Sequence, residues 1–141
     1  MGRTASGVRG MKLKGEDFLV SMGKINSKDA KDLQIAVISQ RGYGKRSPLS
    51  NYKVQNRGGS GIRTHKVSEK SGKVVKAFIV NNNEVKEQDL VIISEKGQVI
   101  RLPLKSTPVL NRDTQGVRVM RFKIDTDKVA SVAAVGIKKE D

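Results

Sequence analysis

The chain has 141 residues, of which 28 are lysine or arginine and 14 are aspartate or glutamate, so its formal net charge is +14. Such an excess of positive charge favours a polyanionic partner, and the absence of cysteine excludes disulfides and cysteine-ligated zinc. Aromatic residues make up only 4%, which argues against broad stacking platforms for single strands, and no apolar run is long enough to span a bilayer, so no membrane partner is expected.

Short strands are predicted along the whole chain, because apolar and β-branched runs alternate with polar turns that contain glycine. No helix longer than one turn is predicted. In chain order the predicted strands cover residues 7–13, 18–22, 33–39, 45–49, 61–67, 73–80, 90–94, 99–104, 116–123 and 128–135.

The pattern repeats. Residues 38–63 align without a gap to residues 93–118, at a constant offset of 55. A truncated third copy ends near the N-terminus, where Arg3, Ser6, Gly7 and Arg9 match Arg57, Ser60, Gly61 and Arg63 at an offset of 54. A period of about 50 positions, with about four short strands in each unit, is typical of propeller blades.

We therefore predict an all-β fold of propeller-like, four-stranded blades in a partial ring. Residues 1–31 form the end of an incomplete blade, residues 32–88 a complete blade and residues 89–141 a final blade. Because two to three blades cannot close a ring by themselves, two alternatives are expected: the sequence is a piece of a longer chain, or the chain self-associates through its open blade edges.

The charges follow the same period. Residues 1–15, 41–66 and 96–112 contain basic residues and no acid, while the acids gather at other phases of the repeat. A basic stripe that recurs blade by blade resembles a track for a phosphate backbone. The residues predicted to contact such a backbone are Arg46, Arg57, Arg63, Arg101, Arg112 and Arg118, with Lys45 and Arg9 behind them.

The most specific string is QNRGGSG at residues 55–61. Its glycines would let the backbone approach an anion and expose N–H groups to it, although a flexible connector between blades has the same composition. The chain lacks the Gly-Lys-Ser/Thr spacing of a nucleotide-binding P-loop.

This string resembles the Q-R-R-G-G-K-G box in the C-terminal domain family of bacterial DNA gyrase A. GYGKRSPLSNYKVQNRGGSGIRT and GQVIRLPL resemble the last two blades of that domain, and GRTASGVRGMKL resembles the end of the blade before them. Asn56 and Ser60 replace basic residues of the box. The C-terminal domain of topoisomerase IV is similar, but the near-intact box favours gyrase. The box-like residues are Gln55, Arg57, Gly58, Gly59 and Gly61.

The resemblance implies a β-pinwheel, a propeller-like ring usually of six blades, that binds and bends duplex DNA around its basic rim with little sequence preference. It further implies a part of an ATP-dependent type IIA topoisomerase that supports DNA supercoiling. The implied partners are double-stranded DNA, the remainder of gyrase A, and gyrase B, in the bacterial cytoplasm at the nucleoid.

No catalytic, cofactor or metal site is predicted. His65 has no second histidine or evident carboxylate partner, and Tyr43 and Tyr52 lack the setting of a nucleophile. The chain is therefore expected not to be an enzyme on its own. Two other readings of the basic surface stay open: a scaffold that binds an acidic protein surface, and an RNA-binding module.

Overall fold

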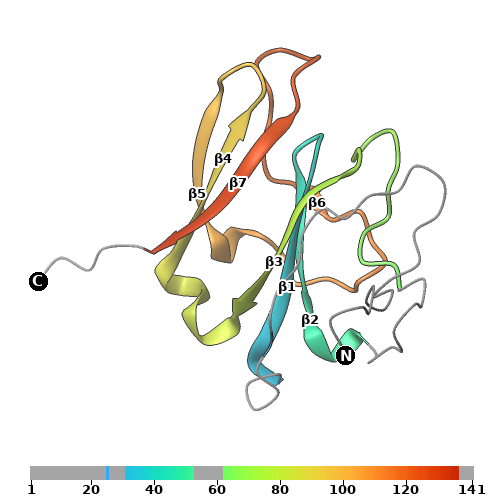
Figure 1. Ribbon diagram of the computed structural model, residues 1–141, viewed down its shortest axis with the longest axis vertical. Coiled ribbons are helices and arrows are strands. Elements are labelled where there is room, and N and C mark those ends of the chain that lie inside the picture. Colours follow the sequence, from blue (N-terminus) through green and yellow to red (C-terminus); the bar gives the residue numbers. More distant parts are fainter. Residues whose placement is uncertain (1–24, 26–30, 53–61, 137–141) are drawn as a thin grey trace, which may run out of the picture.

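Two antiparallel sheets make up the part of the chain that the computed structural model describes, which is residue 25 and residues 31–52 and 62–136. Figure 1 shows the two sheets packed beside each other. The all-β prediction is thus confirmed. Among the described residues, no helix has the length and apolarity needed to cross a lipid bilayer.

The first sheet has the strand order β3-β1-β2-β6 and the second the order β5-β4-β7. The first comprises β1 (Leu33–Ser39), β2 (Tyr43–Pro48), β3 (Val74–Asn81) and β6 (Val117–Arg118). The second comprises β4 (Gln88–Ser94), β5 (Val99–Pro103) and β7 (Val129–Gly136). Among the described residues, short 3-10 helices follow three of these strands: η2 (Leu49–Asn51), η3 (Asn82–Glu87) and η4 (Leu104–Ser106).

The central hairpins repeat because their sequences repeat. β1 pairs with β2 and β4 pairs with β5 in matching registers: Ala36 opposes Arg46 just as Val91 opposes Arg101 at the same phase of the next repeat. Each first strand is a run of aliphatic and β-branched residues, which suits a strand covered by its neighbours. Proline ends both β2 and β5, where no further ladder hydrogen bond is needed.

The predicted third strand of each unit, at residues 61–67 and 116–123, is longer than the β pairing that the structure shows there. Residues 116–123 contribute only the two-residue strand β6, and this strand joins the first sheet, not the second. Within residues 62–67 the only β pairing is an isolated bridge of His65 to Thr114. The second sheet therefore has three strands among the described residues. The blade boundaries at 31/32 and 88/89 stay a prediction, as do the strands at 7–13 and 18–22, which lie outside the described residues.

The core lies between the two sheets. Ala36 and Ile38 of β1 pack in one buried cluster with Leu90 and Ile92 of β4. Further members of this cluster are Val80, Val85, Leu104, Met120, Val129 and Val132. One unit could not bury this surface alone, so each sheet depends on its neighbour for stability. Lys76 of β3 adds a link between the sheets, since its ammonium donates to the Val132 carbonyl at 3.0 Å.

Candidate nucleic-acid interface

One segment of the second repeat crosses onto the first sheet, and we call residues 107–120 the junction segment. The backbone of Arg46 in β2 holds its beginning: the Arg46 N–H donates to Pro108 O, and Leu110 N–H donates to Arg46 O, both at 2.8 Å. At its other end β6 pairs antiparallel with Tyr43 and Gly44. The junction segment therefore runs beside β2, at that edge of the first sheet (Figure 1).

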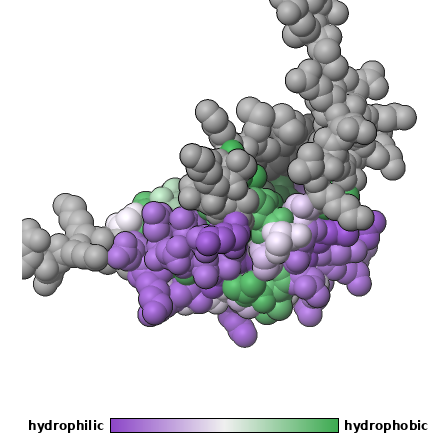
Figure 2. All heavy atoms as spheres, turned by 90° about the horizontal axis from the view of Figure 1, so that it is seen from below, coloured by the Kyte–Doolittle hydropathy of each residue, from purple (hydrophilic) through white to green (hydrophobic). Residues whose placement is uncertain are grey.

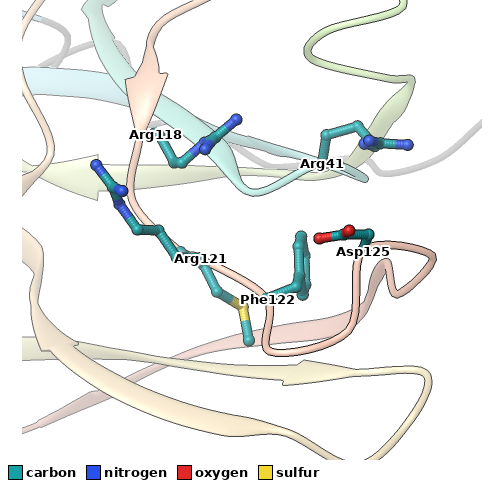
Figure 3. Close-up of a pocket in the computed structure, with 6 residues that line it drawn as sticks. Arg41, Arg118, Arg121, Phe122 and Asp125 are labelled. Carbon is teal, nitrogen blue, oxygen red and sulfur yellow. The ribbon is translucent and has the colours of Figure 1, made fainter.

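Three guanidinium groups line a hollow of about 300 Å³ where the junction segment ends. Arg118 comes from β6 and Arg121 from the loop that follows, whereas Arg41 comes from the turn between β1 and β2 (Figure 3). The remaining lining residues are Met120, Phe122 and Asp125. Figure 3 shows Arg41 across the hollow from Phe122 and Asp125. Three positive groups against one carboxylate make this hollow, the arginine pocket, suited to an anion such as a phosphate.

The Tyr43 ring orients one wall of the arginine pocket. The Arg118 guanidinium carbon lies 5.5 Å from the centre of this ring, and Arg118 also approaches the Tyr43 hydroxyl at 3.4 Å. Lys70 places its ammonium 5.9 Å from the same ring. Because Tyr43 is buried, its position is fixed by packing, and the two cations are attracted to a preformed surface.

A second basic group lies at the middle of the junction segment. The Arg112 guanidinium donates to the backbone carbonyl of Arg63 at 2.8 Å, and Arg63 forms an exposed ion pair with Asp113 at 3.6 Å. The fold thus brings Arg63 and Arg112, which belong to different repeats, to one place. An ion pair this exposed contributes little to stability, so the Arg63 side chain remains available to a ligand.

Two predicted DNA-binding residues are corrected by their burial. Lys45 is 0% exposed and Arg46 is 7% exposed, so neither presents its charge to a partner. Lys45 donates to Asn111 O, Arg112 O and Thr114 Oγ1, while Arg46 donates to Thr107 O, Thr107 Oγ1 and Gln34 Oε1. Their charges fasten the junction segment to β2, because its carbonyl groups need donors once they are buried.

Burial also shifts the pKa values of Lys45, Arg46 and His65. It lowers the pKa of Lys45 to about 8, an effect that the nearby Asp113 carboxylate opposes, and it lowers the pKa of Arg46. His65 is buried beside them, with neither ring nitrogen hydrogen-bonded, and its pKa is lowered to about 4 by burial and by the charge of Lys45. Among the described residues, no group of three His, Cys, Asp or Glu could hold a metal ion.

The other predicted residues fall elsewhere. Arg101 lies on β5 of the second sheet, exposed and paired with Asp89 at 2.7 Å, and is not gathered with the arginines of the junction segment. Arg9, Arg57 and the rest of the box-like set (Gln55, Gly58, Gly59 and Gly61) lie outside the described residues.

Sequence reasoning missed Arg41 and Arg121, because it ranked positions by identity between repeats. At an offset of 55, Arg41 corresponds to Lys96 and Arg121 to Lys66, so the charge recurs although the residue type changes. Comparing charge instead of identity would have found both. Figure 2 shows hydrophilic surface on both sides of a narrow hydrophobic strip on the face that it presents.

A family model and the sequences of curated relatives identify the same protein family. The model of a family described as DNA gyrase C-terminal domain, beta-propeller, matches residues 1–26, 34–81 and 88–135. The DNA gyrase A protein of Staphylococcus aureus (strain NCTC 8325 / PS 47) is 38% identical over 143 residues, covering 100% of this chain. The corresponding protein of Staphylococcus epidermidis (strain ATCC 12228) is 37% identical over 135 residues, covering 96% of this chain. The chain spans 15% and 14% of the lengths of these two relatives.

Solved structures agree on the fold. A DNA gyrase A C-terminal domain superposes with a TM-score of 0.63 and 25% identity, over 72% of this chain and 33% of that one. The C-terminal domain of DNA topoisomerase IV superposes with a TM-score of 0.76 and 23% identity, over 92% of this chain and 38% of that one.

Proposed function

The chain belongs to the DNA gyrase C-terminal domain family, and from this premise we propose that it binds duplex DNA with little sequence preference and bends it. The observation that carries the proposal is a series of arginines on the junction segment and just after it, which we call the basic line. In chain order these are Arg112 and Arg118 of the junction segment and Arg121 of the loop that follows, and Arg41 meets Arg118 and Arg121 at the arginine pocket. Phosphates placed at intervals along a backbone are the ligand that such a line fits.

The recurrence of these charges supports a track and not a single site. Arg118 and Arg121 occupy the phases of Arg63 and Lys66 in the preceding repeat. A second unit with the same junction would therefore present an equivalent basic pair one blade further along. A duplex that follows several such pairs must curve, which makes bending a consequence of the repeat.

The energies are compatible with this mechanism. Bending 20–30 base pairs by 40–90° costs about 1–6 kcal/mol. Charge-assisted hydrogen bonds contribute about 1.5–3 kcal/mol each, so three contacts, from Arg41, Arg118 and Arg121, would contribute about 4.5–9 kcal/mol, enough to offset a cost of this size. No base contact is required, and weak sequence preference follows.

The partners and location follow from the same proposal. As a C-terminal module, the chain would act with the remainder of gyrase A and with gyrase B, in the bacterial cytoplasm at the nucleoid. Strand cleavage and ATP hydrolysis would reside in those other parts of a type IIA topoisomerase. The module would supply the wrapped DNA on which supercoiling depends.

The proposal is tested by titrating a fluorescent duplex of about 40 base pairs, longer than the bent stretch considered above, at several salt concentrations. We expect log K to fall with log salt, with a slope of about −0.9 per phosphate contacted. The triple variant Arg41→Ala, Arg118→Ala, Arg121→Ala should bind more weakly, with a slope shallower by about 0.9 for one phosphate held in the arginine pocket and by up to about 2.7 for three separate phosphates.

The matched control removes the same charge elsewhere, through the exposed residues Lys73, Lys86 and Lys105, each changed to alanine. Equal losses in both triple variants would show that only net charge matters and would reject the arginine pocket. Binding that favours structured RNA of equal length, or no duplex binding at all, would reject the function. Sealing a nicked plasmid with ligase in the presence of the chain then reports wrapping, and its handedness, as a change in linking number.

We also propose that the exposed face of the second sheet mediates weak self-association. Ile93 and Val99 oppose each other there and are 39% and 63% exposed. Ile38, at the phase of Ile93 in the preceding repeat, is 0% exposed because it packs in the core between the sheets. Sedimentation velocity should show concentration-dependent association that Ile93→Lys abolishes; a chain that stays monomeric at high concentration would refute it.

A further inference from the structure

The junction segment reverses direction around a single buried ammonium. Val109 bridges to Arg46 in parallel, whereas β6 pairs with β2 antiparallel, so the chain must turn back between them at residues 111–116. The Lys45 ammonium lies inside this reversal and donates to Asn111 O at 2.9 Å, to Arg112 O and to Thr114 Oγ1 at 3.0 Å. All three donors of the ammonium are therefore used within one loop.

These hydrogen bonds hold the loop that bears Arg112 and leads to Arg118, two arginines of the basic line. The carbonyl of Arg112 is an acceptor of Lys45, so the backbone that bears the Arg112 side chain is fixed by that hydrogen bond. Arg118 follows the reversal directly, in β6. Without a donor at Lys45, the Arg112 carbonyl would lose this hydrogen bond and the Asn111 carbonyl would keep only the one from Thr114 Oγ1. A loop that exposes the Arg112 carbonyl to water would then become more favourable.

The second repeat offers an internal comparison. Ile100 occupies the phase of Lys45 in that repeat and cannot donate a hydrogen bond. Its strand, β5, pairs only with β4 among the described residues and has no junction segment beside it. The lysine thus occurs on the strand that holds a junction segment, and an aliphatic residue occurs on the strand that does not.

We propose that Lys45 is a positioning residue for DNA binding, which sets the conformation of the junction segment and thereby the placement of Arg112 and Arg118, without touching DNA itself. This role rests on the function proposed above. Lys45 is fully buried, so its effect on DNA binding would be indirect. Arg112 and Arg118, in contrast, would contact DNA themselves.

The experiment combines amide hydrogen exchange without DNA and a double-mutant cycle with DNA. Lys45→Met keeps the length of the side chain and removes the donors. We expect faster exchange at residues 111–119 and unchanged exchange in β4 and β7. In DNA titrations, Lys45→Met should weaken binding about tenfold in the otherwise unaltered chain, but less than about twofold in a chain that already carries Arg112→Ala and Arg118→Ala.

Lys66→Met is the control for loss of one charge, because the Lys66 side chain is exposed. Its effect should be similar in both backgrounds. Thr114→Val removes one acceptor of Lys45 and the hydrogen bond from Thr114 Oγ1 to Asn111 O in the same loop. It should reproduce the non-additive loss at smaller size, about threefold, and keeps the role testable should Lys45→Met fail to fold.

Additive losses in the cycle, or unchanged exchange at residues 111–119, would overturn the role of Lys45. If the unaltered chain bound no duplex, the proposed function itself would fail, and with it any role of Lys45 in binding. Normal binding of the unaltered chain with additive losses would reject the role of Lys45 alone.

Discussion

Gly116 tests how closely the junction segment must approach the first sheet. Its φ is +78°, and a Cβ atom there would lie 2.6 Å from the backbone oxygen of Gly44. Gly97 provides a matched control, because its φ is +91° but a Cβ atom would meet nothing within 4 Å. Alanine at Gly97 costs only the left-handed backbone, about 1–2 kcal/mol. Alanine at Gly116 has the same backbone cost and, in addition, an overpacking cost of about 1–3 kcal/mol, because the Cβ atom would contact backbone atoms of Gly44.

The two variants should therefore differ in their free energy of unfolding, measured by urea denaturation. We expect Gly116→Ala to destabilise the chain by about 2–5 kcal/mol in total, and Gly97→Ala by about 1–2 kcal/mol. Gly116→Ala should also weaken duplex binding, because it displaces β6 and with it Arg118, whereas Gly97→Ala should leave binding unchanged. Equal destabilisation by both variants would refute the close approach of the junction segment to β2.

Three further predictions concern the buried residues His65, Lys45 and Tyr43, which pack against the junction segment or its arginines. His65 has a lower pKa folded than unfolded, so the unfolded chain binds more protons between about pH 4 and 6.5; the free energy of unfolding should fall as pH decreases through that range, and His65→Gln should flatten it. Burial lowers the pKa of Lys45 to about 8 in the folded chain, where the side chains of Asp113 and His65 lie nearby. The unfolded chain therefore binds more protons between pH 8 and pH 10.5, so the free energy of unfolding should rise over that range, and Lys45→Met should remove the rise. Tyr43→Leu should weaken duplex binding by about two- to fivefold, with less than a twofold effect of Tyr43→Phe, since the phenylalanine ring still attracts Arg118; equal losses in a titration would exclude the ring contact.

Most strands could be read from the chain because their information is local, although β2 and β4 each begin two residues earlier than predicted. Residues 33–39 form β1 with no change of boundary, and β3 and β7 begin and end within one residue of prediction. Aliphatic runs, turn glycines and strand-ending prolines lie within a few positions of each other there. The third strand failed for the opposite reason: β6 is defined by its pairing with Tyr43 and Gly44 in the preceding repeat, and nothing in residues 116–123 encodes that partner.

The candidate site divides in the same way. The amino-acid sequence determined the repeat period, the all-β class and the recurrence of positive charge at fixed phases, since these depend only on the order of residue types. Tertiary structure alone decided which of those charges face water. Lys45 and Arg46 lie close in sequence to the exposed Arg41, yet a segment from the following repeat covers them and takes up their hydrogen-bonding groups. Burial is a property of what crosses a strand, and only the folded chain brings that segment across β2.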